Sequence, residues 1–130
     1  MKRETAAHLD RAAELLGVAR ENYDNRHFAD SVSRSYYATF HAATGLLMTI
    51  DIERGSHHAL WSAFGEHVSA PGLLDKKYHR LALDLFYQRS QADYMAVPES
   101  TAEDAATALE MAEEFVAACR TFLESRDKGA

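Results

Sequence analysis

The stretch from Ser31 to Ile50, SVSRSYYATFHAATGLLMTI, is the feature that most constrains the fold, because it is almost wholly apolar and suited to a helix of several turns. Its only fixed charge is Arg34, and His41 follows seven residues later. At about 3.6 residues per turn, positions i and i+7 are nearly eclipsed two turns apart. The segment therefore predicts a helix that carries one cation and one imidazole on the same face.

Helical spacing divides residues 28–48 into two stripes on opposite sides of the predicted helix. The stripe expected in the core comprises Phe28, Val32, Tyr36, Phe40, Ala43 and Leu47. The opposite stripe comprises Arg34, Tyr37, Ala38, His41, Gly45 and Met48. A solvated face normally carries Glu and Lys, whereas this one carries aromatic, small and sulfur side chains. We therefore expect a second copy of the chain to cover it, with Ala38 and Gly45 allowing close helix approach.

The rest of the chain has helical spacing in almost every segment and no sustained strand alternation. Ser56 is expected to cap the third helix, Val97-Pro98 to end the fourth, and Ser100 with Glu103 to form a capping box for the fifth. The sequence predicts one all-α domain over residues 1–130, an up-and-down five-helix bundle. Its helices are expected at about 3–23, 27–49, 56–68, 73–94 and from about 100 onward.

The composition excludes several classes of protein. The formal net charge of −6 argues against coating of nucleic acid by bulk electrostatics, although residues 101–130 hold much of the acidity and a local basic site remains possible. Cys119 is the only cysteine, which excludes an intramolecular disulfide and fits a reducing compartment. No signal peptide is visible, and the polar residues of 31–50 argue against a membrane span. We therefore expect a cytoplasmic protein with no membrane partner.

Three sequence motifs occur in the order found in one known family. Residues 33–43, SRSYYATFHAA, resemble the signature helix of the HEPN superfamily, in the branch with an R-x-YYA-x-FHAA pattern. Residues 56–58 and 63–67 resemble the third helix of that branch, and residues 89–94, RSQADY, resemble its R-x-x-ADY ending. The resemblance covers roughly residues 5 to 124 without large insertions.

The resemblance implies an all-α bundle that dimerises and is often encoded beside a minimal nucleotidyltransferase as a toxin and antitoxin pair. Many members are metal-independent endoribonucleases with an Arg-x(4 to 6)-His motif, which Arg34 and His41 match at its longest spacing. The residue after the motif arginine is often Asn, Asp or His in active members, and here it is Ser35. Ala43 occupies the position of a tyrosine that a related branch presents for adenylylation, so that modification is not expected here.

The residue chemistry is compatible with such an activity. An imidazole with a pKa near 6.5 can transfer protons at neutral pH, and a guanidinium can hold a phosphate by two hydrogen bonds. We therefore assign His41 as the acid or base and Arg34 as the phosphate clamp, with Tyr37 and Ser35 in the cleft. One histidine per chain does not serve as both acid and base, whereas a two-fold dimer supplies two. The products would end in a 2′,3′-cyclic phosphate.

Other interpretations remain open. Arg34 and His41 could simply form hydrogen bonds across a dimer interface, in a structural dimer without activity of its own. Alternatively, the chain could be a non-catalytic module that binds a nucleotidyltransferase partner or a nucleotide. Arg89 and Asp93 could support the site, or form an ordinary i, i+4 ion pair. His57 and His58 lack a further ligand at metal-binding spacing, so neither a metal nor another cofactor is expected.

Overall fold

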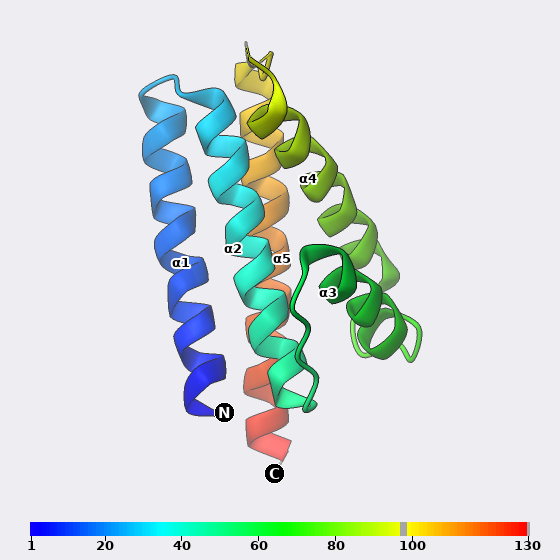
Figure 1. Ribbon diagram of the computed structural model, residues 1–130. Helices are drawn as coiled ribbons and strands as arrows, with labels where there is room; N and C mark the ends of the chain where they lie inside the picture. The colour runs from blue at the N-terminus through cyan, green and yellow to red at the C-terminus, as the bar shows by residue number, and fades with distance from the viewer. Residues whose placement is uncertain (97–98, 130) are drawn as a thin grey trace.

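The computed structural model describes residues 1–96 and 99–129 and is helical, as the spacing predicts. Figure 1 shows that the four long helices run alternately up and down, that the short third helix lies between α2 and α4, and that both termini lie at the same end. The amino group of Met1 contacts the carboxylate of Asp127 at 2.8 Å at that end. The helices are α1 (Arg3–Asp24), α2 (Phe28–Thr49), α3 (His57–Phe64), the π-helical turn η1 (Gly65–Ser69), α4 (Lys76–Tyr94) and α5 (Ala102–Gly129).

Helix α2 is the centre of the bundle, because it packs against α1, α3, α4 and α5 (Figure 1). It is buried on more than one side, which explains why residues 31–50 contain so few charges. The predicted core residues Val32, Tyr36, Ala43 and Leu47 are buried, while Phe28 and Phe40 are partly buried against the same core. The predicted all-α bundle is therefore confirmed.

The α1–α2 seam corrects the expectation for the small residues of α2. Ala38 is fully buried within the chain, and a Cβ atom on Gly45 would lie 3.1 Å from the backbone oxygen of Thr5. The hydroxyl of Thr5 donates to the Gly45 carbonyl at 3.0 Å, and that of Ser31 donates to the Ala19 carbonyl at 2.8 Å. Small residues do allow two helices to approach closely, but the second helix is α1 of the same chain.

Two helix starts differ from the predicted ones. Helix α4 begins at Lys76 and not near residue 73, because the carboxylate of Asp75 accepts from the Lys77 N–H at 2.9 Å and caps it. The capping box of α5 is one residue later than Ser100 and Glu103: Thr101 and Asp104 exchange backbone–side-chain hydrogen bonds of 2.9 and 3.1 Å.

The remaining boundaries agree with the sequence or lie outside the described residues. Ser56 caps α3 as predicted, since its hydroxyl accepts from the Ala59 N–H at 3.1 Å. Helix α4 ends at Tyr94, whereas the predicted terminator Val97-Pro98 lies outside the described residues. Within residues 1–96 and 99–129, no helix has both the length and the apolar composition needed to cross a bilayer.

Candidate active site

His41 lies half-buried on α2, at the edge of the α1–α2 seam. Its Nδ1 atom is 3.0 Å from Nδ1 of His8 on α1, and the two rings stack with centroids 5.2 Å apart. Burial lowers the pKa of His41, and electrostatic repulsion from the neighbouring His8 and Arg11 lowers it further. At neutral pH His41 is therefore an uncharged imidazole, the form that can accept a proton.

Arg34 lies two turns from His41, about 10 Å along the axis of α2 at 1.5 Å per residue. Its side chain is exposed, in contrast to the half-buried His41. Arg11 lies one turn beyond His8 on α1, on the same side of that helix, and is bonded to Glu14 at 2.9 Å. The seam therefore presents two imidazoles, with one guanidinium close to His41 and a second further along α2.

On the other side of α2, aromatic rings surround Arg89. The guanidinium carbon of Arg89 lies 5.1 Å from the ring centroid of Tyr36, 5.4 Å from that of Tyr37 and 5.6 Å from that of Phe86. Arg89 also donates to Asp93 at 3.2 Å. Its side chain is only 12% exposed, so the rings and Asp93 hold the cation in place. The structure thus shows the i, i+4 ion pair and also brings Arg89 against Tyr37.

His57 belongs to the same aromatic cluster through a short hydrogen bond. Its Nδ1 atom lies 2.6 Å from the hydroxyl oxygen of Tyr36, and the Trp61 Nε1–H donates to that oxygen at 3.0 Å. Because Trp61 can only donate, the Tyr36 hydroxyl is free to donate its own hydrogen to His57. Burial raises the pKa of Tyr36 to about 12, so the phenol keeps that hydrogen.

This network fixes the tautomer of His57. An Nδ1 atom that accepts a hydrogen bond leaves the ring hydrogen of a neutral imidazole on Nε2. Burial lowers the pKa of His57, and the nearby charge of Arg89 lowers it further, so the neutral form is favoured. The ring stacks on Phe40 at 4.4 Å between centroids. Phe40 in turn meets His41 edge-on at 5.7 Å, and so joins the two histidines.

The six residues predicted for the site are not all brought together. His41, Tyr37, Arg89 and Asp93 border one continuous set of ring contacts, and Arg34 is exposed further along α2. Ser35 is fully buried, and its hydroxyl has no hydrogen-bond partner. Ser35 therefore does not line the surface that carries Arg34, because a residue next to the motif arginine points about 100° away from it, here into the bundle.

Sequence reasoning missed three groups near His41. His8 and Arg11 come from α1, and only the antiparallel register of α1 and α2 shows that they lie opposite His41. The role of His57 is missed as well, because its bond to Tyr36 depends on how α3 packs. A spacing of three between His8 and Arg11 was the available signal, because it puts both on one side of a helix.

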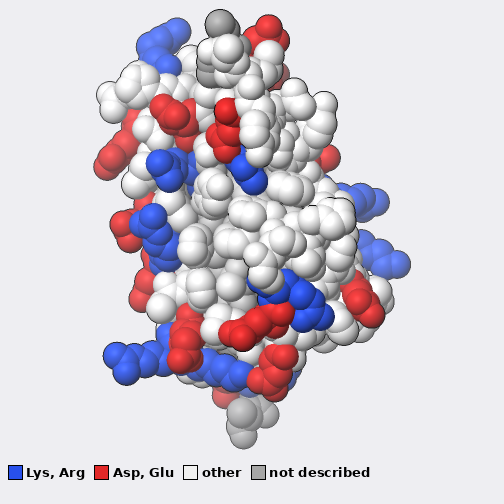
Figure 2. All heavy atoms as spheres, viewed as in Figure 1, with Lys and Arg blue, Asp and Glu red and all other residues white. Residues whose placement is uncertain are grey.

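In the view shared by Figures 1 and 2, the central part of the face is largely uncharged, and charged side chains lie above it, below it and at its sides. Helix α4 adds the exposed side chains of Leu83, Tyr87 and Tyr94, which helical spacing puts on one side of the helix. Within residues 1–96 and 99–129, no three His, Cys, Asp or Glu side chains are grouped as a metal site.

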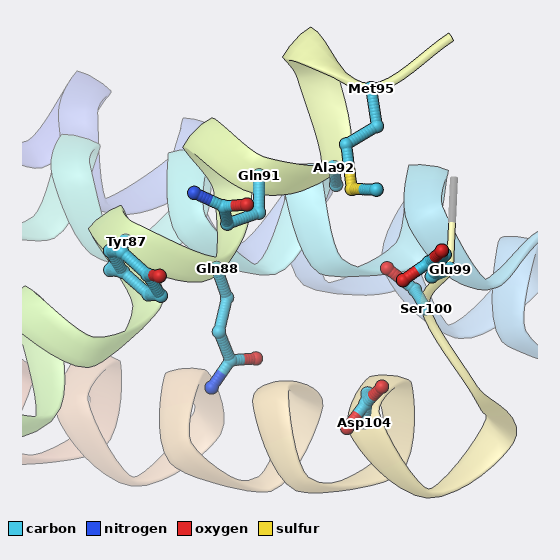
Figure 3. A pocket seen from close by; sticks show the side chains of 8 residues that line it. All are labelled: Tyr87, Gln88, Gln91, Ala92, Met95, Glu99, Ser100 and Asp104. Carbon is cyan, nitrogen blue, oxygen red and sulfur yellow. The ribbon is translucent and has the colours of Figure 1, made fainter. Parts of the chain in front are cut away.

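A separate pocket lies between α4 and the start of α5. Figure 3 shows Gln88 and Asp104 on opposite walls, with Met95, Glu99 and Ser100 at one end. Its volume is about 370 Å³, but two of its lining side chains, Glu99 and Asp104, are carboxylates. Like charges repel a phosphate, so this pocket is less suited to a phosphate group than the seam that holds Arg11 and His41.

Comparison with known proteins identifies the family. The sequence profile described as "HEPN domain" matches residues 5–122. The chain belongs to the HEPN domain family. The "UPF0332 protein glr0978" of Gloeobacter violaceus is 40% identical over 86 residues, which are 66% of this chain and 68% of that protein. "Putative toxin MJ0605" of Methanocaldococcus jannaschii is 31% identical over 116 residues, 89% of this chain and 86% of that protein.

The HEPN fold is also seen in a solved structure. The crystal structure of TT1696 from Thermus thermophilus superimposes with a TM-score of 0.77 over 93% of this chain and 99% of that chain. The two sequences are 18% identical, so this likeness concerns the fold alone. In this HEPN domain, α2 is the helix that carries the signature residues 33–43, and it is the helix around which the other four pack.

Proposed function

We propose that this HEPN domain is the metal-independent endoribonuclease toxin of a toxin and antitoxin pair. The observation that carries the proposal is that α2 presents an exposed guanidinium, Arg34, and a half-buried imidazole, His41, on one side of the helix. The similarity to a relative named as a putative toxin supports the role, and so does the family itself. A minimal nucleotidyltransferase is the antitoxin we propose as the partner.

The proposed reaction is an internal transfer within RNA. Nε2 of His41 takes the proton of a ribose 2′-hydroxyl, and the 2′-oxygen attacks the adjacent phosphorus atom. The bond from phosphorus to the 5′-oxygen breaks, and that oxygen leaves with a proton from the protonated His41 of the second copy in the proposed dimer. The products are a 2′,3′-cyclic phosphate and a free 5′-hydroxyl. Arg34 and Arg11 stabilise the extra negative charge on the phosphorane by hydrogen bonds and charge.

We propose that the active form is a homodimer. About 10 Å along α2 separates Arg34 from His41, so a two-fold partner could bring Arg34 of one copy near His41 of the other. The covered surface would include Tyr37 and the exposed Leu83, Tyr87 and Tyr94 of α4. An uncharged, aromatic surface of this kind is suited to pairing with its own copy.

The activity test uses the full chain, purified away from the proposed nucleotidyltransferase partner. The substrate is structured cellular RNA, and excess EDTA is present. Because the proposed proton transfers need no metal, we expect cleavage and products with 2′,3′-cyclic phosphate ends. Arg34→Ala and His41→Ala should each lower the cleavage rate about a hundredfold or more. Lys128→Ala, a distant charge change near the end of α5, is the matched control and should keep full activity.

Two outcomes would contradict the ribonuclease proposal. Equal cleavage by the wild type and by the double variant of Arg34 and His41 would assign the activity to a contaminant. If the wild type cuts no RNA after removal of the nucleotidyltransferase partner, the alternative interpretation is favoured. In that interpretation the chain is a non-catalytic module that binds a nucleotidyltransferase or a nucleotide.

The dimer is tested separately by light scattering. Tyr87→Arg in the exposed α4 stripe should convert the dimer into a monomer with an unchanged helical spectrum. Thr121→Arg, on the exposed side of α5, is the control and should remain dimeric. A wild type that stays monomeric at high concentration would refute the proposed dimer.

A further inference from the structure

His8 is the side chain that contacts His41 through a ring nitrogen. The two Nδ1 atoms are 3.0 Å apart, and the ring planes are inclined by 28°, so the pair combines a hydrogen bond with stacking. His8 is held there because its helix packs closely on Gly45, where a Cβ atom would lie 3.1 Å from the Thr5 backbone oxygen and 3.2 Å from the His8 Cβ. The tight α1–α2 seam therefore determines where His8 lies.

The contact restricts which ring nitrogens of His8 and His41 can carry hydrogens. A hydrogen bond between two Nδ1 atoms needs a hydrogen on one and a lone pair on the other. When both rings are neutral, the ring with the Nδ1 hydrogen has a bare Nε2, and the other ring carries its hydrogen on Nε2. In either arrangement, the pair offers one proton acceptor and one hydrogen-bond donor at its two Nε2 atoms.

A proton added to the pair is held differently from a proton on a single histidine. With one proton added, both Nε2 atoms carry hydrogens, and one hydrogen remains between the Nδ1 atoms. A second proton would put two Nδ1 hydrogens and two positive charges into the same contact, which would break it. The geometry of the contact therefore accommodates one added proton but not two.

We propose that His8 and His41 act as one acid–base pair, in which His8 is the positioning residue that fixes the tautomer of His41 and shares its proton. The inference rests on the proposed ribonuclease function and names the group through which the site works. When Nε2 of His41 takes the 2′-hydroxyl proton, the hydrogen on its Nδ1 shifts toward Nδ1 of His8. One proton has been added, and the charge is spread over two rings.

Charged groups from α1 and from the connection between α2 and α3 lie around the pair. Arg11 of α1 lowers the affinity of His41 for a proton, and its own charge is partly balanced by Glu14. A cavity of about 250 Å³ adjoins His8, with Glu53 and Arg54 among the residues that line it. Further groups on the neighbouring elements are Arg34 on α2 and His57 on α3, which is linked to His41 through the ring of Phe40.

The first test follows the titration of the two rings by NMR and needs no RNA. In the wild type, the signals of His8 and His41 should move together in two steps, because coupled groups share their ionisations. In His8→Phe, which keeps a stacking ring but has no ring nitrogen, His41 should titrate in one step. A single, independent step for His41 in the wild type would overturn the proposal.

The second test measures RNA cleavage against pH. His8→Phe should lower the rate at neutral pH by about tenfold to a hundredfold, less than the loss of His41 itself. His8→Asn should restore much of that rate, because its amide can bond to Nδ1 of His41, but it should lose the second ionisation from the pH profile. A profile in His8→Phe identical to that of the wild type would refute the role of His8.

The two tests separate this inference from the proposed function. Shared two-step titration in a protein that cuts no RNA would support the pair and refute the ribonuclease activity. Cleavage that depends on His41 but is unaffected by either His8 variant would support the ribonuclease activity and refute the role of His8. His58→Phe, at an exposed histidine that follows His57, is the control for general effects of losing an imidazole.

Discussion

On its α1 side, α2 packs through small and hydroxyl-bearing residues, whereas on its α3–α4 side it packs through large rings. The first side brings two backbones together at Thr5 and Gly45. The second surrounds Tyr36 with His57, Trp61 and Arg89. The difference shows two ways to hold a histidine: backbone register holds His8 against His41, and a side-chain network holds His57.

The largest expected effect concerns the α1 side of α2, where the two backbones approach closely. Gly45→Leu should lower the free energy of unfolding by about 3 kcal/mol, at the upper end for overpacking, because its Cβ already meets the Thr5 backbone. Gly17→Leu is the matched control in α1, where a Cβ would meet nothing within 4 Å. It should raise stability by roughly 0.5–1 kcal/mol through helix propensity. If urea denaturation gives the same change in the free energy of unfolding for Gly45→Leu and Gly17→Leu, the close approach of α1 and α2 is contradicted.

The next effect concerns the aromatic side. Tyr36→Phe should lower the free energy of unfolding by about 1–3 kcal/mol. The substitution keeps the ring but leaves the Trp61 N–H and Nδ1 of His57 without their hydrogen-bond partner. Tyr37→Phe removes a hydroxyl from the neighbouring half-buried ring and should change stability by less than about 0.5 kcal/mol. Thermal unfolding of the two variants decides this, and similar losses would argue against the Tyr36 network.

Local patterns were sufficient to predict most of the fold but not the contacts of the site. The helical spacing of residues 31–50 predicts α2 and its buried stripe, and Ser56 marks the start of α3. What covers the face with Gly45 depends on how α1 returns beside α2, and a single sequence does not show this register. The same register brings His8 to His41.

A smaller effect is expected at Ser35, which sequence reasoning assigned to the cleft. Its hydroxyl is fully buried without a partner, so Ser35→Ala removes an unsatisfied polar group and adds helix propensity. We expect an unchanged or higher free energy of unfolding, by up to about 1 kcal/mol, and an unchanged rate of RNA cleavage. A large loss of cleavage without a loss of stability would return Ser35 to the site.

The smallest expected effect is a dependence of stability on pH that both sides of α2 share. The folded protein lowers the pKa values of His41 and His57, both first of all by burial, and both rings remain partly exposed. The unfolded chain therefore binds more protons near and below a pH of about 6.5, the ordinary histidine pKa. The stabilising contribution of these two groups is complete above that pH and is lost as the pH falls toward their folded pKa values.

Denaturation at neutral pH and at about pH 5.5, one unit below the ordinary histidine pKa, measures this contribution. Carboxylates also titrate in acid, so the comparison is made against the variant with His41→Asn and His57→Asn, in which the Asn at position 57 keeps an acceptor for the Tyr36 hydroxyl. The wild type should lose more stability on acidification than this variant does. Single variants then assign the loss to each side of α2. Parallel losses in the wild type and the double variant would mean that neither histidine is held in its neutral form by the fold.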